Sequence, residues 1–74
     1  MTATWNERIE TFWAKADRDD PEATMTAMRM LMSERPAGDA EALFEWASVH
    51  DFLGDEQAAV PLYQAALEQG LSGD

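Results

Sequence analysis

The sequence predicts an all-α fold in which four antiparallel helices form two helical hairpins. Apolar residues recur with helical spacing in four segments, and no segment shows the sustained alternation that a strand needs. The segments between them are roughly two to five residues long, which makes successive helices antiparallel. With 74 residues, 46% of them hydrophobic, residues 1–74 have the size and composition of a single domain with a small core.

The first helix is predicted to begin after Thr4, because Thr4 and Glu7 have the spacing of a capping box. The polar residues 17–20 end it. We expect one face of this helix to enter the core. That face carries Trp5, Ile9, Phe12, Trp13 and Ala16.

The second helix is predicted to begin at Asp20 and Pro21, which provide an N-cap acceptor and a proline at the first helical position. The Pro-Ala-Gly sequence at residues 36–38 ends it. Its methionines can fill the core or provide an adaptable apolar surface. The apolar stripe is expected to contain Thr24, Ala27, Met28 and Leu31, and the other methionines are Met25, Met30 and Met32.

The third and fourth helices are predicted on either side of Gly54, which suits the left-handed position after a helix. Asp39 caps the third, from about Ala40 to Leu53, with Leu43, Trp46, Ala47, His50 and Leu53 on one side. Asp55 caps the fourth, which ends at Gly70 and carries Ala59, Tyr63 and Ala66 on one side. Pro61 lies inside this helix, where it removes one backbone hydrogen bond and is expected to bend the axis.

The two hairpins repeat with a period of about 35 residues, which is typical of helical repeat proteins. From Ala40 the chain reads AEALFEWASVHDFLGDEQAAVPLYQAALEQGL, which resembles a tetratricopeptide repeat over residues 40–73. Leu71 departs from the proline that closes the repeat in the family. Residues 4–36 share only the period, the helix pair and Pro36, so we expect a degenerate helical hairpin there. The matching positions are Leu43, Trp46, Ala47, His50, Leu53, Gly54, Ala59, Tyr63 and Ala66.

The charge distribution excludes several kinds of partner. Residues 1–39 contain all five basic residues and eight acidic ones, whereas residues 40–74 contain seven acidic residues and no basic one, for a net charge of −10. Nucleic acids and anionic membranes require clustered cations, so neither is expected as a partner. The longest uncharged run, residues 57–67, is too short to span a bilayer, and the first sixteen residues contain no apolar signal segment. Together with the absence of cysteine, this predicts a cytoplasmic protein.

No catalytic site, metal site or cofactor is expected. Ser48, His50 and Asp51 share one helix, on which residues two apart point in different directions, so they cannot form a catalytic triad. No metal-ligating residue lies three or four positions from His50. The acidic run 17–22 lacks the glycine and one ligand of a calcium loop. No serine lies in the Asp-Ser-Leu context of an acyl carrier protein, which the length and charge would otherwise fit.

The family resemblance implies a concave groove that is lined by the first helix of each hairpin. This groove is acidic and aromatic, which suits a basic or apolar peptide or helix as partner. The alternative is a solvated face on which the two phenylalanines pack against the first hairpin. The residues at groove positions are Glu41, Phe44, Glu45, Ser48, Asp51 and Phe52.

The fourth helix provides a second candidate surface, because Val60, Leu62 and Leu67 lie outside its packed face. Two repeats rarely bury a sufficient core alone, so we expect self-association through these residues, as a dimer, or docking of a segment beyond Asp74. The sequence therefore predicts a non-catalytic protein-interaction or assembly module, a scaffold. The alternative is a small acidic carrier or regulatory protein that acts through its charge.

Overall fold

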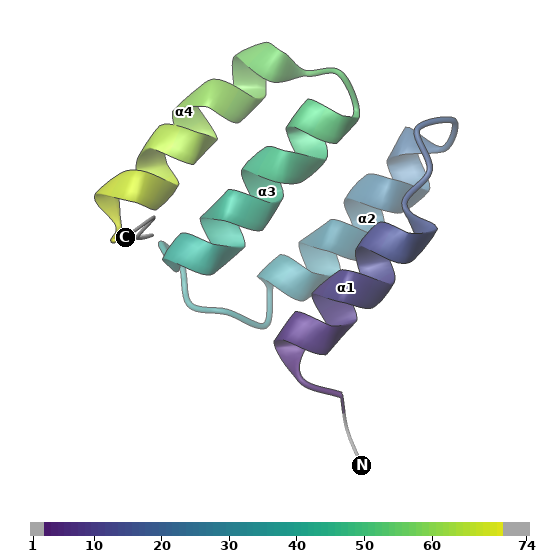
Figure 1. Ribbon diagram of the computed structural model, residues 1–74, viewed down its shortest axis with the longest axis horizontal. Coiled ribbons are helices and arrows are strands. Elements are labelled where there is room, and N and C mark those ends of the chain that lie inside the picture. The colour runs from purple at the N-terminus through teal and green to yellow at the C-terminus, as the bar shows by residue number, and fades with distance from the viewer. Residues whose placement is uncertain (1–2, 71–74) are drawn as a thin grey trace.

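Residues 3–70 are described in the computed structural model, and they form four α-helices: α1 (Trp5–Lys15), α2 (Pro21–Met32), α3 (Ala40–Phe52) and α4 (Glu56–Glu68). No strand occurs within residues 3–70. The helices run antiparallel in sequence order, and α3 lies between α4 and the pair formed by α1 and α2 (Figure 1). The predicted all-α fold of two helical hairpins is confirmed.

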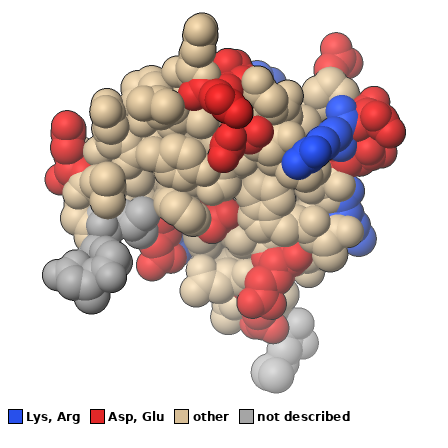
Figure 2. Space-filling view, turned by 45° about the horizontal axis from the view of Figure 1, so that its top comes forward, with Lys and Arg blue, Asp and Glu red and all other residues tan. Residues whose placement is uncertain are grey.

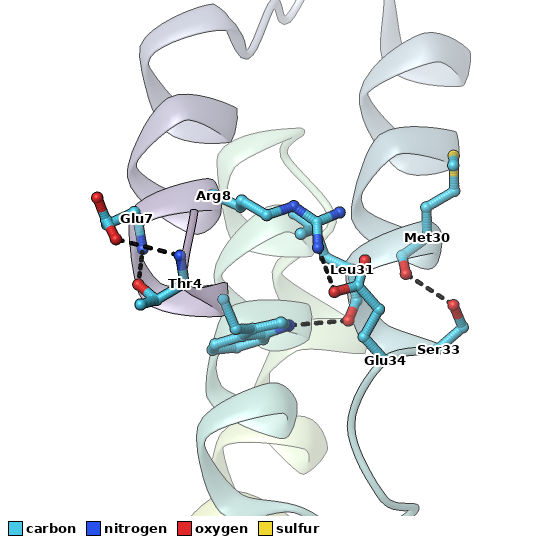
Figure 3. A network of polar contacts seen from close by, with 8 residues as sticks. Thr4, Glu7, Arg8, Met30, Leu31, Ser33 and Glu34 are labelled. Atoms are coloured by element: carbon cyan, nitrogen blue, oxygen red, sulfur yellow. Dashed lines mark hydrogen bonds and ion pairs between the residues drawn. The ribbon is translucent and has the colours of Figure 1, made fainter. Parts of the chain in front are cut away.

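Each helix begins directly after a residue whose side chain accepts a hydrogen bond from the first helical turn. Thr4 Oγ1 accepts from the Glu7 backbone N–H at 3.2 Å, and the Glu7 carboxylate accepts from the Thr4 N–H at 3.1 Å (Figure 3). These two bonds form the predicted capping box. The backbone N–H of Thr4, and after it the Thr4 side chain, holds the pKa of the Glu7 carboxylate below its ordinary value. The other three helices are capped as predicted, by Asp20, Asp39 and Asp55.

The core is a cluster of large side chains that joins the first hairpin to α3. Met28 and Val49 are completely buried in it. At its edge the Trp5 indole N–H donates to the Leu31 carbonyl at 2.9 Å. Arg8 forms an ion pair with Glu34 between α1 and the end of α2 (Figure 3). The buried members of the cluster are Ile9, Phe12, Met28, Leu31 and Val49.

The second hairpin closes on small side chains. Among the described helices, α4 packs against α3 alone, and the two backbones approach each other closely along their length. The fully buried residues of α4 are Ala59 and Ala66, and Ala47 is fully buried on α3. Side chains of this size allow the helix axes to come near each other, because ridges and grooves then interlock with little volume between them.

One residue of the predicted apolar stripe of α2 is misplaced, because Ala27 is exposed. Thr24, Met28 and Leu31 are buried as expected, and Thr24 Oγ1 donates to the Asp17 carbonyl at 3.0 Å. Ala27 lines the open groove beside α1, so the buried stripe of α2 is narrower than the apolar pattern suggests. On α3, in contrast, the buried face is wider than the predicted one. Val49 is buried although it lies outside the predicted face, because α3 has helices on both flanks.

The turn between α3 and α4 has a glycine in the left-handed conformation, as predicted. Gly54 has a φ of 87°, in the left-handed region that glycine adopts without the steric cost of a Cβ atom. Leu53 caps α3 instead of extending it, and its backbone N–H reaches the Val49 carbonyl at 3.0 Å. Pro61 lies within α4, which continues on both sides of it. Leu71 and the last positions of the predicted repeat lie outside the described residues.

Candidate functional site

Two of the predicted groove residues, Glu45 and Phe52, contact the first hairpin. The Trp13 indole N–H donates to Glu45 Oε1 at 2.8 Å. The rings of Trp13 and Phe52 meet edge to face with their centroids 5.6 Å apart. The Arg18 guanidinium lies 4.9 Å from the centroid of the same Phe52 ring. These contacts fix α1 against α3 and leave Glu45 and Phe52 half-buried.

Two other groove residues, Phe44 and Ser48, are directed toward α4. The ring centroids of Phe44 and Tyr63 are 5.7 Å apart. The Ser48 hydroxyl donates to the Phe44 carbonyl at 2.9 Å and accepts from the Tyr63 hydroxyl at 3.4 Å. Phe44 nevertheless stays 38% exposed, so its ring is available for contact with a partner.

The remaining groove residues, Glu41 and Asp51, are exposed carboxylates near the two ends of α3. Glu41 Oε2 lies 3.7 Å from Arg35 Nη2. Arg35 also donates to both carboxylate oxygens of Asp39, at 3.1 and 3.2 Å. This bidentate contact, with the N–H of Ala42, lowers the pKa of Asp39. Glu41, at the start of α3, is therefore held by an ion pair to the segment that links the two hairpins.

The six residues thus form a strip along α3 and do not form one open pocket. Its edges contact α1 on one side and α4 on the other, and Phe44, Asp51 and Glu41 are the exposed members. A strip of carboxylates and aromatic rings can bind cations and apolar groups.

Ser48, His50 and Asp51 form no hydrogen bond with one another in the described part of the chain. Ser48 bonds to Phe44 and Tyr63, and His50 Nδ1 lies 2.7 Å from the Trp46 carbonyl. Within residues 3–70 there is also no group of three or more His, Asp or Glu side chains that could hold a metal ion. None of the helices in that range has the length and apolarity required to cross a membrane.

Comparison with known proteins assigns the second hairpin to a family. The family model described as Tetratrico peptide repeat matches residues 40–74. The second hairpin, formed by α3 and α4, is of the tetratricopeptide repeat type. Repeats of this kind generally serve as protein-interaction modules and scaffolds. No curated protein and no solved structure matched the chain.

The tetratricopeptide repeat pattern indicates the groove positions of α3 but not the residues that flank them. Trp13 and Arg18 come from the first hairpin, which does not carry the pattern. Trp13 was predicted only as a core residue. Its indole N–H is the signal that could have indicated the contact with Glu45. A partly buried indole needs a hydrogen-bond acceptor, and a carboxylate is a strong one.

The second predicted surface lies on the far side of the tetratricopeptide repeat. Val60 and Leu67 on α4 are 54% and 63% exposed. Leu62 is half-buried and contributes less to this surface than predicted. On the opposite side of the molecule, α1 and α2 leave between them a groove of about 490 Å³, to which Ala27 contributes.

Proposed function

We propose that this protein is a non-catalytic protein-interaction module that binds a basic or apolar peptide or helix along α3. The observation that carries the proposal is the strip that combines exposed carboxylates with the partly exposed ring of Phe44. The edges of the strip are fixed by Trp13 and Tyr63, so the surface is preformed and its side chains lose less conformational entropy when a partner binds.

The charge of the strip supports the choice of partner. Residues 40–74 contain seven acidic residues and no basic residue, and Figure 2 shows Lys and Arg mainly on the side of α1 and α2. A peptide that ends in a carboxylate or carries acidic side chains would be repelled along α3. A peptide with basic and apolar side chains would be attracted and could pack against Phe44.

We further propose that the two hairpins act as one domain in the cytoplasm. Trp13 and Arg18 join the first hairpin to the tetratricopeptide repeat, so the binding strip needs both. The chain contains no cysteine, which suits a reducing compartment.

Binding can be tested with two labelled amphipathic helical peptides that share the same leucines and carry either lysines or glutamates. We expect fluorescence anisotropy to show binding of the lysine peptide only. Phe44→Ala is expected to raise its Kd about fivefold or more, since truncated aromatic anchors typically cost that much. Asp51→Asn should weaken binding less, because Asp51 acts through charge at an exposed position.

Glu22→Gln is the matched control, because it removes one exposed carboxylate at the start of α2, away from α3. It should leave the Kd unchanged. Equal binding of both peptides would refute the proposed partner. Salt distinguishes the alternative of an acidic regulatory protein: binding through charge alone collapses as ionic strength rises, whereas binding that includes Phe44 persists.

A further inference from the structure

The two phenylalanines of the strip, Phe44 and Phe52, lie about two turns apart on α3 and differ in what covers their rings. The Phe52 ring contacts Trp13 edge to face and carries the Arg18 guanidinium 4.9 Å from its centroid. The Phe44 ring contacts Tyr63 at a centroid distance of 5.7 Å and stays 38% exposed. In the described part of the chain, no cationic side chain lies over it. The strip therefore combines a ring that binds a cation of the chain itself with a ring that stays available to a partner.

Arginine is the cation that contacts aromatic rings in the described structure. Arg18 lies on Phe52, and the Arg35 guanidinium lies 4.6 Å from the centroid of the Trp5 ring. Arg35 at the same time donates to both carboxylate oxygens of Asp39, at 3.1 and 3.2 Å. The planar guanidinium can do both, because its face is attracted to the negative face of a ring while its N–H groups point outward in its plane. Arg35 is thus an example, within this chain, of an arginine that a ring and a carboxylate hold together.

The charges around Phe44 favour a cation from outside the chain. Glu41 precedes Phe44 by three residues and Asp51 follows it by seven, so both of these exposed carboxylates lie on the same side of α3 as the ring. Arg35 Nη2 lies 3.7 Å from Glu41 Oε2. Its guanidinium is bonded more closely to Asp39, so these three side chains together keep a net negative charge. α4, on the other side of Phe44, contributes no basic residue.

The edge of the strip toward α1 does not reverse this balance. Arg18 is the basic side chain that contacts the strip there, through the Phe52 ring, and Glu45 offsets its charge. Glu45 itself is bonded to the neutral indole N–H of Trp13. With these two charges cancelled, Glu41 and Asp51 leave the strip negative, and a basic side chain of a partner is attracted to it.

We infer that the partner of the strip presents an arginine whose guanidinium lies on the exposed part of the Phe44 ring, near the carboxylates of Glu41 and Asp51. Such an arginine repeats the ring contact of Arg18 and adds a carboxylate, as Arg35 does. A lysine ammonium is a compact, strongly hydrated charge with no flat face to lie on the ring. The inference rests on the function proposed above and narrows its partner from a basic or apolar segment to one with an arginine at this position.

The test compares two peptides that differ only in the kind of cation. One is the amphipathic lysine peptide described above, and the other has every lysine replaced by arginine. Both carry the same charge and the same leucines, so a difference in Kd reports on contacts of the guanidinium. We expect fluorescence anisotropy to give a Kd about two- to fivefold lower for the arginine peptide, which is the size of an exposed cation–π contact.

Two variants at position 44 separate the ring from the carboxylates. Phe44→Leu keeps an apolar side chain but removes the ring, so the two peptides should then bind with equal Kd. Phe44→Tyr keeps an aromatic ring and is the matched control, in which the preference for arginine should persist. Because Phe44 is partly exposed, both variants are expected to fold, which circular dichroism checks.

Nuclear magnetic resonance measures the contact directly, with an arginine peptide that contains no aromatic residue. The ring current of an aromatic side chain shifts protons above its face upfield, so the side-chain protons of one bound arginine should shift upfield in the complex with the parent protein. In the complex with Phe44→Leu this shift should be lost. If Phe44→Leu does not fold, the parent protein with the two peptides still decides the question.

Equal Kd values for the two peptides on the parent protein overturn the inference, and binding of both then leaves the proposed function standing. A preference for arginine that persists in Phe44→Leu overturns it as well, because the carboxylates alone then recognise the guanidinium. Failure of both peptides to bind overturns the proposed function and this inference with it. These results differ from one another, so the experiment shows which of the two proposals has failed.

Discussion

The first hairpin, α1 and α2, is filled by large side chains, whereas the second, α3 and α4, closes on alanines. In the first, Phe12 and Met28 occupy the space between helices whose backbones come close at few points. In the second, Ala59 and Ala66 allow α4 to lie against α3 over its whole length. Both are antiparallel helix pairs of similar length, so the difference lies in the packing.

This difference shows why the two hairpins suit different tasks. The widely spaced helices of the first hairpin leave an open groove on one side and share their core with α3 on the other. The closely packed second hairpin has little internal volume, so its larger apolar side chains, such as Val60 and Leu67, stay on the outside. The same comparison predicts opposite sensitivities to side-chain volume.

The largest effect is expected from truncating the core of the first hairpin. Met28→Ala should lower the free energy of unfolding by about 2–5 kcal/mol, because it removes a completely buried side chain and leaves a cavity. Urea denaturation measures this loss. Met30→Ala, the same change at an exposed position on the same helix, should stay within about 0.5 kcal/mol of the parent. Similar losses for both variants would contradict the described core.

An intermediate effect is expected from enlarging an alanine of the second hairpin. Ala66→Leu should cost about 1–3 kcal/mol, because the added atoms force α4 away from α3. Thermal and urea unfolding followed by circular dichroism would measure it. Ala14→Leu at an exposed position of α1 serves as the control and should be nearly neutral. A stabilised Ala66→Leu variant would show that the alanines leave unfilled space.

The smallest effect is expected at the joint between the hairpins, where Asp39 caps α3 and binds Arg35. Asp39→Ala should cost about 0.5–2 kcal/mol at neutral pH, as the loss of a helix cap does. Asp55→Ala removes a cap from α4 that forms no ion pair within residues 3–70, and it should cost less.

Asp39 also makes the stability of the joint dependent on pH. Its pKa is lower in the folded protein than the ordinary 3.8, so its contribution is complete above about pH 5 and is lost as the pH falls through the folded pKa. Asp39→Asn keeps a capping oxygen but cannot titrate. Urea midpoints between neutral and acid pH should therefore fall less in this variant than in the parent. Parallel declines would indicate that other carboxylates control acid unfolding.

The helix boundaries and much of the core could be predicted because they depend on local signals. Thr4, Asp20, Asp39 and Asp55 each cap the helix that follows them, and Gly54 adopts the left-handed conformation that its position requires. Caps and turns involve residues within a few positions of each other, so the order of residues is sufficient to indicate them.

The surroundings of the candidate binding strip could not be predicted in this way. The sequence indicates which residues of α3 share a face, but the bond from Trp13 to Glu45 joins residues 32 positions apart, and the contact of Phe44 with Tyr63 crosses between helices. Which phenylalanine is covered therefore depends on the side chains that reach it from other segments, Trp13 and Arg18 at Phe52 and Tyr63 at Phe44.

By itself, the sequence determined the four helices, their antiparallel order and the separation of charge between the two halves. Only the tertiary structure decided that Ala27 lies in an open groove, that Val49 is buried and that Leu62 is partly covered. Helical periodicity describes a face relative to its own axis, whereas burial depends on how many neighbours cover that face and at what distance. That second quantity is set by side-chain volumes on several helices at once, and it emerges only when they pack together.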